Sequence, residues 1–258
     1  MEFNASLDIF TIIFLALIGM TSSFIDSTVG GGGLISTPAL LGLELPVPLA
    51  LGTNKVAASI GAFTSVASFW MAGKIKKKMA LCLMPLSFIG SVIGAYVVNL
   101  LPAALMKEII VVLLVAVAAY TYRRKDWGDN ARVEKLGKAA LVGASIMAAS
   151  IGFYDGFFGP GTGSFLIFGF LFLGFDFVTA AGNAKALNFA SGIGAMFSFA
   201  FSGSIAWSYG LLMGVFTIFG AILGSHLAIR KGVAYVRPLY LVVTTILIGK
   251  QVYEILLK

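Results

Sequence analysis

Long apolar runs that are almost free of charge constrain this chain more than any other feature of its sequence. Five such runs are Ile12–Met20, Met79–Val98, Ile109–Ala119, Phe189–Phe201 and Leu211–Leu223. A helix needs about 20 mainly apolar residues to cross a bilayer. Only 11% of the 258 residues are charged, against roughly 25% in an ordinary soluble domain. The sequence therefore predicts an all-α polytopic membrane protein.

Charge and cysteine usage narrow the possibilities further. The first eight residues contain two acids and no base, so the basic start of a secretory signal peptide is missing and we expect the first apolar run to be retained. The single cysteine, Cys82, excludes an internal disulfide, and in an apolar run a small buried thiol is expected. The net charge of +7 comes from lysines and arginines that are grouped in short segments between the apolar runs. Membrane topology explains this grouping, so the charge does not indicate a protein that binds nucleic acid.

The two halves of the chain resemble each other at an offset of about 130 residues. An offset of 130 places Lys55 on Lys185, and an offset of 129 places Asp26 on Asp155. Glycines and apolar runs match at the same spacing. Because residues of several kinds coincide, the sequence indicates an internal duplication.

The duplication predicts three parts of the chain. A first transmembrane repeat is expected in residues 1–125, a polar cytoplasmic loop in 126–137 and a second transmembrane repeat in 138–258. Each repeat is expected to contain four long helices and one short half-helix, at Leu34–Leu43 or Ser164–Leu173. At about 1.5 Å per residue neither short piece spans a bilayer. Each could complete a re-entrant hairpin or a discontinuous helix, and the sequence does not separate these.

The distribution of Lys and Arg predicts how the repeats are inserted. Bases gather in Lys74–Lys78, in the polar loop and at Arg230 and Lys231, whereas Asn99–Pro102 and Ser202–Tyr209 are poor in them. Short basic loops stay on the cytoplasmic side, so we expect the first group inside and the second outside. Each half then crosses an odd net number of times. This predicts two inverted-topology repeats with both termini outside.

Two Gly-rich breaks interrupt the apolar pattern at matching places in the two halves. Broken backbone at membrane depth is tolerated where it is buried in protein or lines a cavity. A break also exposes the N–H groups of the following half-helix, which suit an anion. The alternative is that the glycines only permit close helix packing. The candidate substrate-binding residues in the breaks are Gly30, Gly31, Gly32, Gly33, Gly159, Gly161 and Thr162.

A lysine lies about twenty residues after each break, in the sequences Gly52–Lys55 and Gly182–Lys185. A lysine inside a membrane helix is costly unless it faces a cavity or a partner. Both are therefore candidates for attracting an anion, and the alternative is a side chain that snorkels near a helix end. The candidates added by these segments are Thr53, Asn54, Lys55, Asn183 and Lys185.

One acidic residue precedes each break, and its charge is also costly inside a membrane helix unless it faces a cavity or a partner. Asp26 and Asp155 are expected to pair with the lysines or to exchange protons that couple transport. Structural ion pairing is the alternative to proton coupling.

Several kinds of enzyme are disfavoured by what the sequence lacks. It has no phosphate loop, no H-E-x-x-H pair and no cysteine cluster, so we expect no ATP hydrolysis, metal or other cofactor. An intramembrane enzyme remains a rival, but the only histidine, His226, has no counterpart in the other half. An anion channel is the second rival, because a pore also needs polar residues at depth. A secondary transporter of small anions is the favoured function.

At the breaks the sequence resembles the TauE/SafE sulfite exporter family, also grouped as the toluenesulfonate uptake permeases. The resemblance covers nearly the whole chain and rests on Ser36–Pro38, Gly52–Lys55, Gly152–Gly163, Asn183 and Lys185. It implies a multi-pass carrier in a bacterial-type inner membrane for sulfur-containing anions of the sulfite and sulfoacetate class. The expected partners are a small anion and the lipid bilayer, with no nucleic acid and with a homodimer left open.

Overall fold

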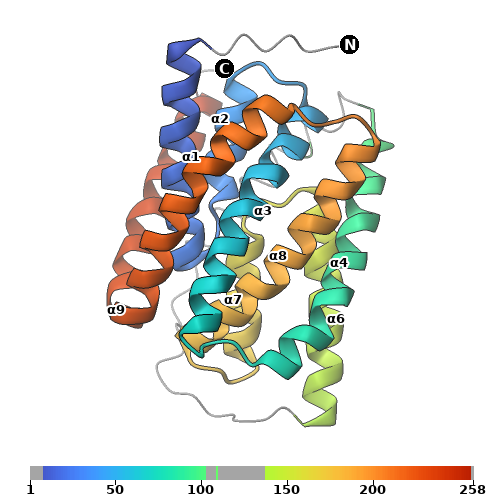
Figure 1. Ribbon diagram of the computed structural model, residues 1–258, viewed down its shortest axis with the longest axis vertical. Helices are drawn as coiled ribbons and strands as arrows, with labels where there is room; N and C mark the ends of the chain where they lie inside the picture. The colour runs from blue at the N-terminus through green and yellow to red at the C-terminus, as the bar shows by residue number, and fades with distance from the viewer. Residues whose placement is uncertain (1–7, 103–108, 110–136, 257–258) are drawn as a thin grey trace.

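The computed structural model describes residues 8–102, 109 and 137–256, with side chains up to residue 232 (Figure 1). The described residues form helices and no strands, which confirms the all-α class. The predicted run Ile109–Ala119 and nearly all of the predicted loop lie outside them. The helices are α1 (Ile9–Val29), α2 (Gly33–Gly42), α3 (Val47–Met71), α4 (Lys77–Asn99), α6 (Lys138–Phe157), α7 (Thr162–Phe172), α8 (Phe177–Phe201) and α9 (Trp207–Leu256).

Four helical segments are long and apolar enough to cross a membrane, namely α1, α4, α6 and the Trp207–Gly232 part of α9. At Gly232 the backbone leaves the helical region, with φ 58° and ψ −152°, so α9 is two helices joined at a kink. Cys82 lies exposed on α4, and the expectation that it is buried is wrong. Lipid accepts an apolar thiol as readily as a protein core does, so apolar surroundings in sequence do not indicate burial within the protein.

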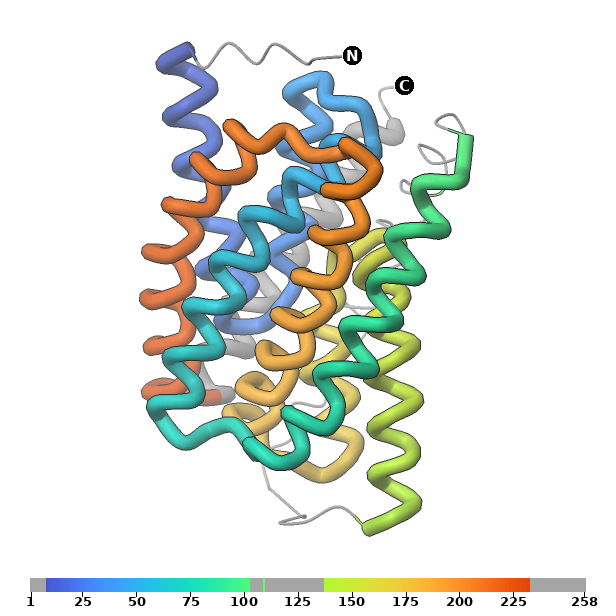
Figure 2. Tube along the Cα trace, turned by 45° about the vertical axis from the view of Figure 1, so that its right-hand side comes forward, coloured from blue at the N-terminus to red at the C-terminus, as the bar shows by residue number. Residues whose placement is uncertain are grey.

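The two short helices are found where the sequence predicts them, α2 starting one residue and α7 two residues early. Each doubles back beside the long helix before it, toward the end where that helix began (Figures 1 and 2). The breaks are therefore the tips of re-entrant hairpins. Gly30 and Gly159 turn the chain with φ of 75° and 94°, a backbone conformation that residues with a side chain rarely adopt.

The helix boundaries recur along the chain. α6 and α7 begin 129 residues after α1 and α2 (138 against 9, 162 against 33), and α8 and α9 begin 130 residues after α3 and α4 (177 against 47, 207 against 77). In Figure 1 α1 starts at the top and α6 at the bottom, and α9 likewise runs opposite to α4. α1 packs on α9, α4 on α6, and α3 on α8. The largest apolar core surrounds α7 and α8, and a smaller one lies among α1, α2, α3 and α9.

Glycines set the closest approaches between long helices. A Cβ atom at Gly94 in α4 would overlap the carbonyl oxygen of Phe153 in α6. The same arrangement recurs where Gly224 in α9 meets the carbonyl oxygen of Phe24 in α1. Small residues allow this contact in membranes, where helix association depends on close packing rather than on hydrophobic burial.

Adding one methyl group at these contacts should destabilise the protein. Gly94→Ala and Gly224→Ala are expected to lose about 1–3 kcal/mol, because the helices must separate to admit the new Cβ atom. Gly143→Ala in α6 is the matched control, since nothing lies within 4 Å of a Cβ atom there. Thermal unfolding of the purified proteins in detergent measures the difference. Equal melting temperatures for Gly94→Ala and Gly143→Ala would contradict the packing argument.

Candidate functional site

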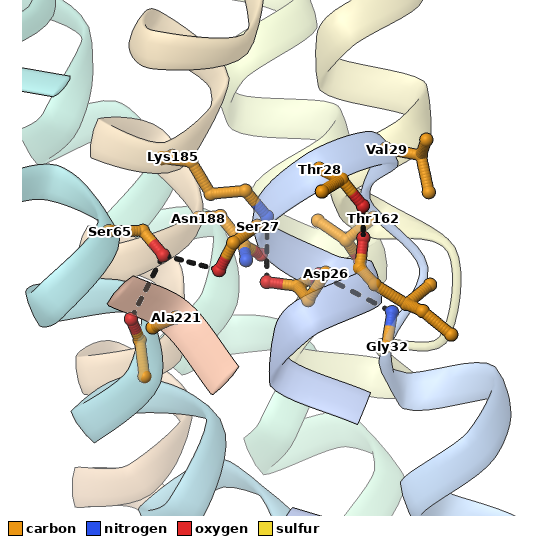
Figure 3. A network of polar contacts seen from close by, with 12 residues as sticks. Asp26, Ser27, Thr28, Val29, Gly32, Ser65, Thr162, Lys185, Asn188 and Ala221 are labelled. Atoms are coloured by element: carbon orange, nitrogen blue, oxygen red, sulfur yellow. Dashed lines mark hydrogen bonds and ion pairs between the residues drawn. The ribbon is translucent and has the colours of Figure 1, made fainter. Parts of the chain in front are cut away.

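Two ion pairs, each with a buried lysine, join the two halves of the chain. Lys55 Nζ lies 2.8 Å from Asp155 Oδ1, and Lys185 Nζ lies 2.7 Å from Asp26 Oδ2 (Figure 3). The lysines are only 4% and 0% exposed, so neither snorkels. An unpaired charge at this depth would cost several kcal/mol. Each half therefore supplies the counterion for the lysine of the other half.

The two breaks lie against each other. Ser164 Oγ at the start of α7 donates a hydrogen bond of 3.1 Å to the carbonyl oxygen of Val29 at the end of α1. A Cβ atom at Gly30 would overlap the backbone of Gly163 and Ser164. Only glycine permits so close an approach of two backbones. Close packing, which the sequence left as the alternative, therefore accounts for Gly30 and Gly163.

A cavity opens beside this contact. The space open to the centre of a water molecule is about 50 Å³, enough for roughly three to five waters or one small oxyanion. Both breaks contribute to its wall, because Gly32 and Gly161 line it. The residues proposed from the sequence that line it are Asp26, Gly31, Gly32, Gly33, Asn54, Lys55, Asp155, Gly159, Gly161 and Thr162.

The cavity brings two helix N-termini together. Gly31 and Gly33 lie at the start of α2, and Gly161 and Gly163 at the start of α7; all four line the cavity. An α-helix provides no carbonyl partner for its first N–H groups, and the N–H groups of these glycines form no hydrogen bond within the described residues. Since the charges of the two ion pairs cancel, attraction for an anion in this conformation depends on these donors and on the helix dipoles.

Four residues proposed from the sequence lie outside the cavity, namely Gly30, Thr53, Asn183 and Lys185. Thr53 Oγ1 accepts a hydrogen bond from the backbone N–H of Ala206 at 2.9 Å. Asn183 Oδ1 accepts one from the N–H of Lys76 at 3.0 Å. Both side chains are buried and each holds a turn between two long helices of the other half. In this conformation neither is available to a bound anion.

The cavity also contains polar side chains that were not among the site residues proposed from the sequence. Ser22 and Ser23 precede Asp26 by about one turn of α1, and Asn188 follows Lys185 by one turn of α8, so helical periodicity around the charged residues is the signal that finds them. The repeat search does not, because most of their counterparts in the other half are apolar. The polar residues are Ser22, Ser23, Ser36, Asn188 and Thr217. Their counterparts at the repeat offsets are, in the same order, Ile151, Gly152, Phe165, Ala58 and Ser87.

Comparison with known proteins gives a consistent result. The family described as "Sulfite exporter TauE/SafE" matches residues 15–250. A "Probable membrane transporter protein ORF9" from Sinorhizobium sp. is 38% identical over 232 residues, covering 90% of this chain and 88% of that protein. A "Probable membrane transporter protein" from Haemophilus influenzae is 34% identical, covering 97% of both chains. The Escherichia coli "Probable membrane transporter protein YfcA" is 33% identical, covering 93% and 89%. No solved structure gives a significant match.

The Lys55–Asp155 pair should behave as a unit in a double-mutant cycle. Lys55→Met or Asp155→Asn alone leaves one buried charge unpaired, which is expected to cost about 3–5 kcal/mol of stability. The Lys55→Met, Asp155→Asn double variant should recover most of that loss. Denaturant unfolding of all four proteins measures the coupling. Losses that simply add in the double variant would contradict a direct interaction between the two side chains.

Proposed function

Because the chain belongs to the TauE/SafE sulfite exporter family and is a membrane transporter rather than an enzyme, we propose that it is a secondary transporter of small sulfur-containing oxyanions or organosulfonates, of the sulfite and sulfoacetate class. The membrane is a bacterial-type inner membrane. The observation that carries the proposal is the cavity at which the N-termini of α2 and α7 meet beside Lys55.

The donors around the cavity suit an anion with several oxygens. Unpaired backbone N–H groups of Gly31, Gly33, Gly161 and Gly163 approach from two helices, and Lys55 adds a positive charge. Asn54 also lines the cavity, and the Nδ2 group of its amide can donate hydrogen bonds to an anion. Charge-assisted hydrogen bonds of this kind are stronger than neutral ones.

Proton coupling follows from the chemistry of Asp155. Its Oδ1 accepts from Lys55, whereas its Oδ2 is buried and has no hydrogen-bond partner within the described residues. A proton on Asp155 removes the carboxylate charge and leaves the Lys55 ammonium free to attract the anion. Proton and anion then bind cooperatively. Asp26 is the corresponding group in the other pair and also lines the cavity.

Oppositely inserted repeats would let this single site face the two sides of the membrane in turn. The recurring helix boundaries and the opposite directions of equivalent helices support that arrangement (Figure 1). In transporters built from inverted repeats the substrate lies at the repeat interface and one part rocks against the other. With the basic segment Lys74–Lys78 inside, both termini lie outside. A carrier of this kind saturates with substrate, whereas a channel does not.

Replacing Lys55 tests the anion site. The Lys55→Met, Asp155→Asn variant leaves no unpaired charge at this position, yet affinity for the anion should fall roughly ten- to hundred-fold, since a hydrogen bond to a charged group contributes about 1.5–3 kcal/mol. The matched control is Lys78→Met, which removes the charge of an exposed lysine on α4 outside the cavity, and its affinity for the anion should stay at the wild-type value. Binding and counterflow are measured with sulfite, thiosulfate, sulfate, sulfonates and carboxylates. A wild-type protein that binds none of the sulfur anions refutes the proposed function.

The pH dependence of binding tests the coupling. Affinity of the wild-type protein for the anion should rise as the pH falls, because protonation of Asp155 frees the Lys55 ammonium. Asp155→Asn mimics the protonated carboxyl group and should bind tightly with little dependence on pH. If transport by the Asp26→Asn, Asp155→Asn double variant kept the wild-type pH dependence, both aspartates would be purely structural.

A further inference from the structure

Five polar side chains of the cavity were not among the site residues proposed from the sequence, and three of these five already have hydrogen-bond partners. Ser22, Ser36 and Thr217 each donate to a carbonyl oxygen three or four residues earlier in the same helix, at 3.3, 3.2 and 2.6 Å. Ser and Thr hydroxyls commonly form such bonds in helices, where they need no external ligand. These three residues are therefore satisfied when the cavity holds no substrate.

Ser23 and Asn188 differ from them. Neither side chain forms a hydrogen bond within the described part of the chain, although both line the cavity. Ser23 is only 7% exposed, and a Cβ atom at Gly61 would lie 2.6 Å from its Oγ, so α3 carries a glycine where the hydroxyl needs room. A polar group buried without a partner costs free energy. The Ser23 side chain is buried and the Asn188 side chain is half-buried, so a ligand in the cavity would complete the hydrogen bonds of both.

The Asp26–Lys185 ion pair fixes the positions of these two side chains. Ser23 lies three residues before Asp26 on α1, and Asn188 three residues after Lys185 on α8, so each shares a helix face with a member of the pair. Figure 3 shows Asn188 together with Lys185 and Asp26. Since the bond of 2.7 Å holds α1 against α8, both donors are kept beside the cavity. This gives Lys185 a positioning role although it does not line the cavity.

We propose that Ser23 and Asn188 bind the oxygens of the transported anion and set its selectivity, an inference that rests on the proposed function. The Ser23 hydroxyl supplies one donor and the Asn188 amide two. They are neutral, so they add hydrogen bonds without adding charge. Together with the backbone N–H groups and Lys55 they surround an anion whose sulfur carries three oxygens, as in sulfite or a sulfonate. A carboxylate has only two oxygens and leaves part of this set unpaired, which disfavours it.

The other half of the chain does not repeat this pair of side chains. The counterparts of Ser23 and Asn188 at the repeat offsets are Gly152 and Ala58, which have no polar side chain. A second equivalent oxygen site is therefore absent from these positions, and substitution of either residue is not compensated by the other half.

Binding of sulfite, methanesulfonate and acetate to the purified full-length protein tests the proposal. Ser23→Ala and Asn188→Ala should each weaken sulfite and methanesulfonate binding about ten- to hundred-fold, and acetate binding less, so that selectivity falls. Asn188→Ser keeps one donor and should recover part of the loss. Ser145→Ala is the matched control, because Ser145 lies half-buried on α6 outside the cavity and bonds its own helix.

The outcomes separate this inference from the function on which it rests. Unchanged affinity and selectivity in Ser23→Ala and Asn188→Ala, with melting temperatures like that of the wild type, would overturn the role of these residues and leave the proposed function standing. Failure of the wild-type protein to bind either sulfur anion would overturn both. A uniform loss for all three anions would show that the two residues contribute affinity without selectivity, which also contradicts the proposal.

Discussion

The two crossed ion pairs are the interaction on which the rest of this structure depends. A lysine and an aspartate from the same half would satisfy each other locally, but here Lys55 pairs with Asp155 and Lys185 with Asp26. Because an unpaired buried charge is so costly, each pair ties helices of opposite halves together at the level of the breaks. α3 is joined to α6 and α8 to α1. The meeting of the breaks, and the cavity beside them, follow from these two bonds.

The glycines of the breaks serve this arrangement in two ways. At Gly159 a side chain is excluded by φ of 94° and by Lys55, whose Nζ would lie 2.6 Å from an added Cβ atom. The ammonium therefore rests against the backbone at the N-terminus of α7. Bare backbone also leaves the N–H groups of Gly33 and Gly163, at the N-termini of α2 and α7, without side-chain caps and so available to a ligand. Packing and binding, which are alternatives when only the sequence is known, are both consequences of the same residues.

Much of this could be predicted from the sequence, and the limits have physical causes. Apolar runs and the repeat offset predict α2 and α7 closely, and the cost of charge in a bilayer singles out Lys55, Lys185 and both aspartates. The crossing of the pairs depends on how segments more than 100 residues apart pack, which no local pattern encodes. Thr53 and Asn183 were proposed as ligands but hold turns. Ser23 is marked only by its helical spacing from Asp26, because a serine can bond its own helix and is inexpensive at any depth.

The crossing of the ion pairs also has a consequence for biogenesis. Asp26 and Lys55 enter the membrane with the first half, but their counterions arrive with α8 and α6. At about 5–20 residues per second the ribosome needs on the order of ten seconds to make the intervening chain. For that interval Asp26 and Lys55 lack the counterions that they have in the folded protein, so neither ion pair can form until the second half is inserted. A truncated product retains these unpaired charges and presents quality-control proteases with an unfinished membrane domain.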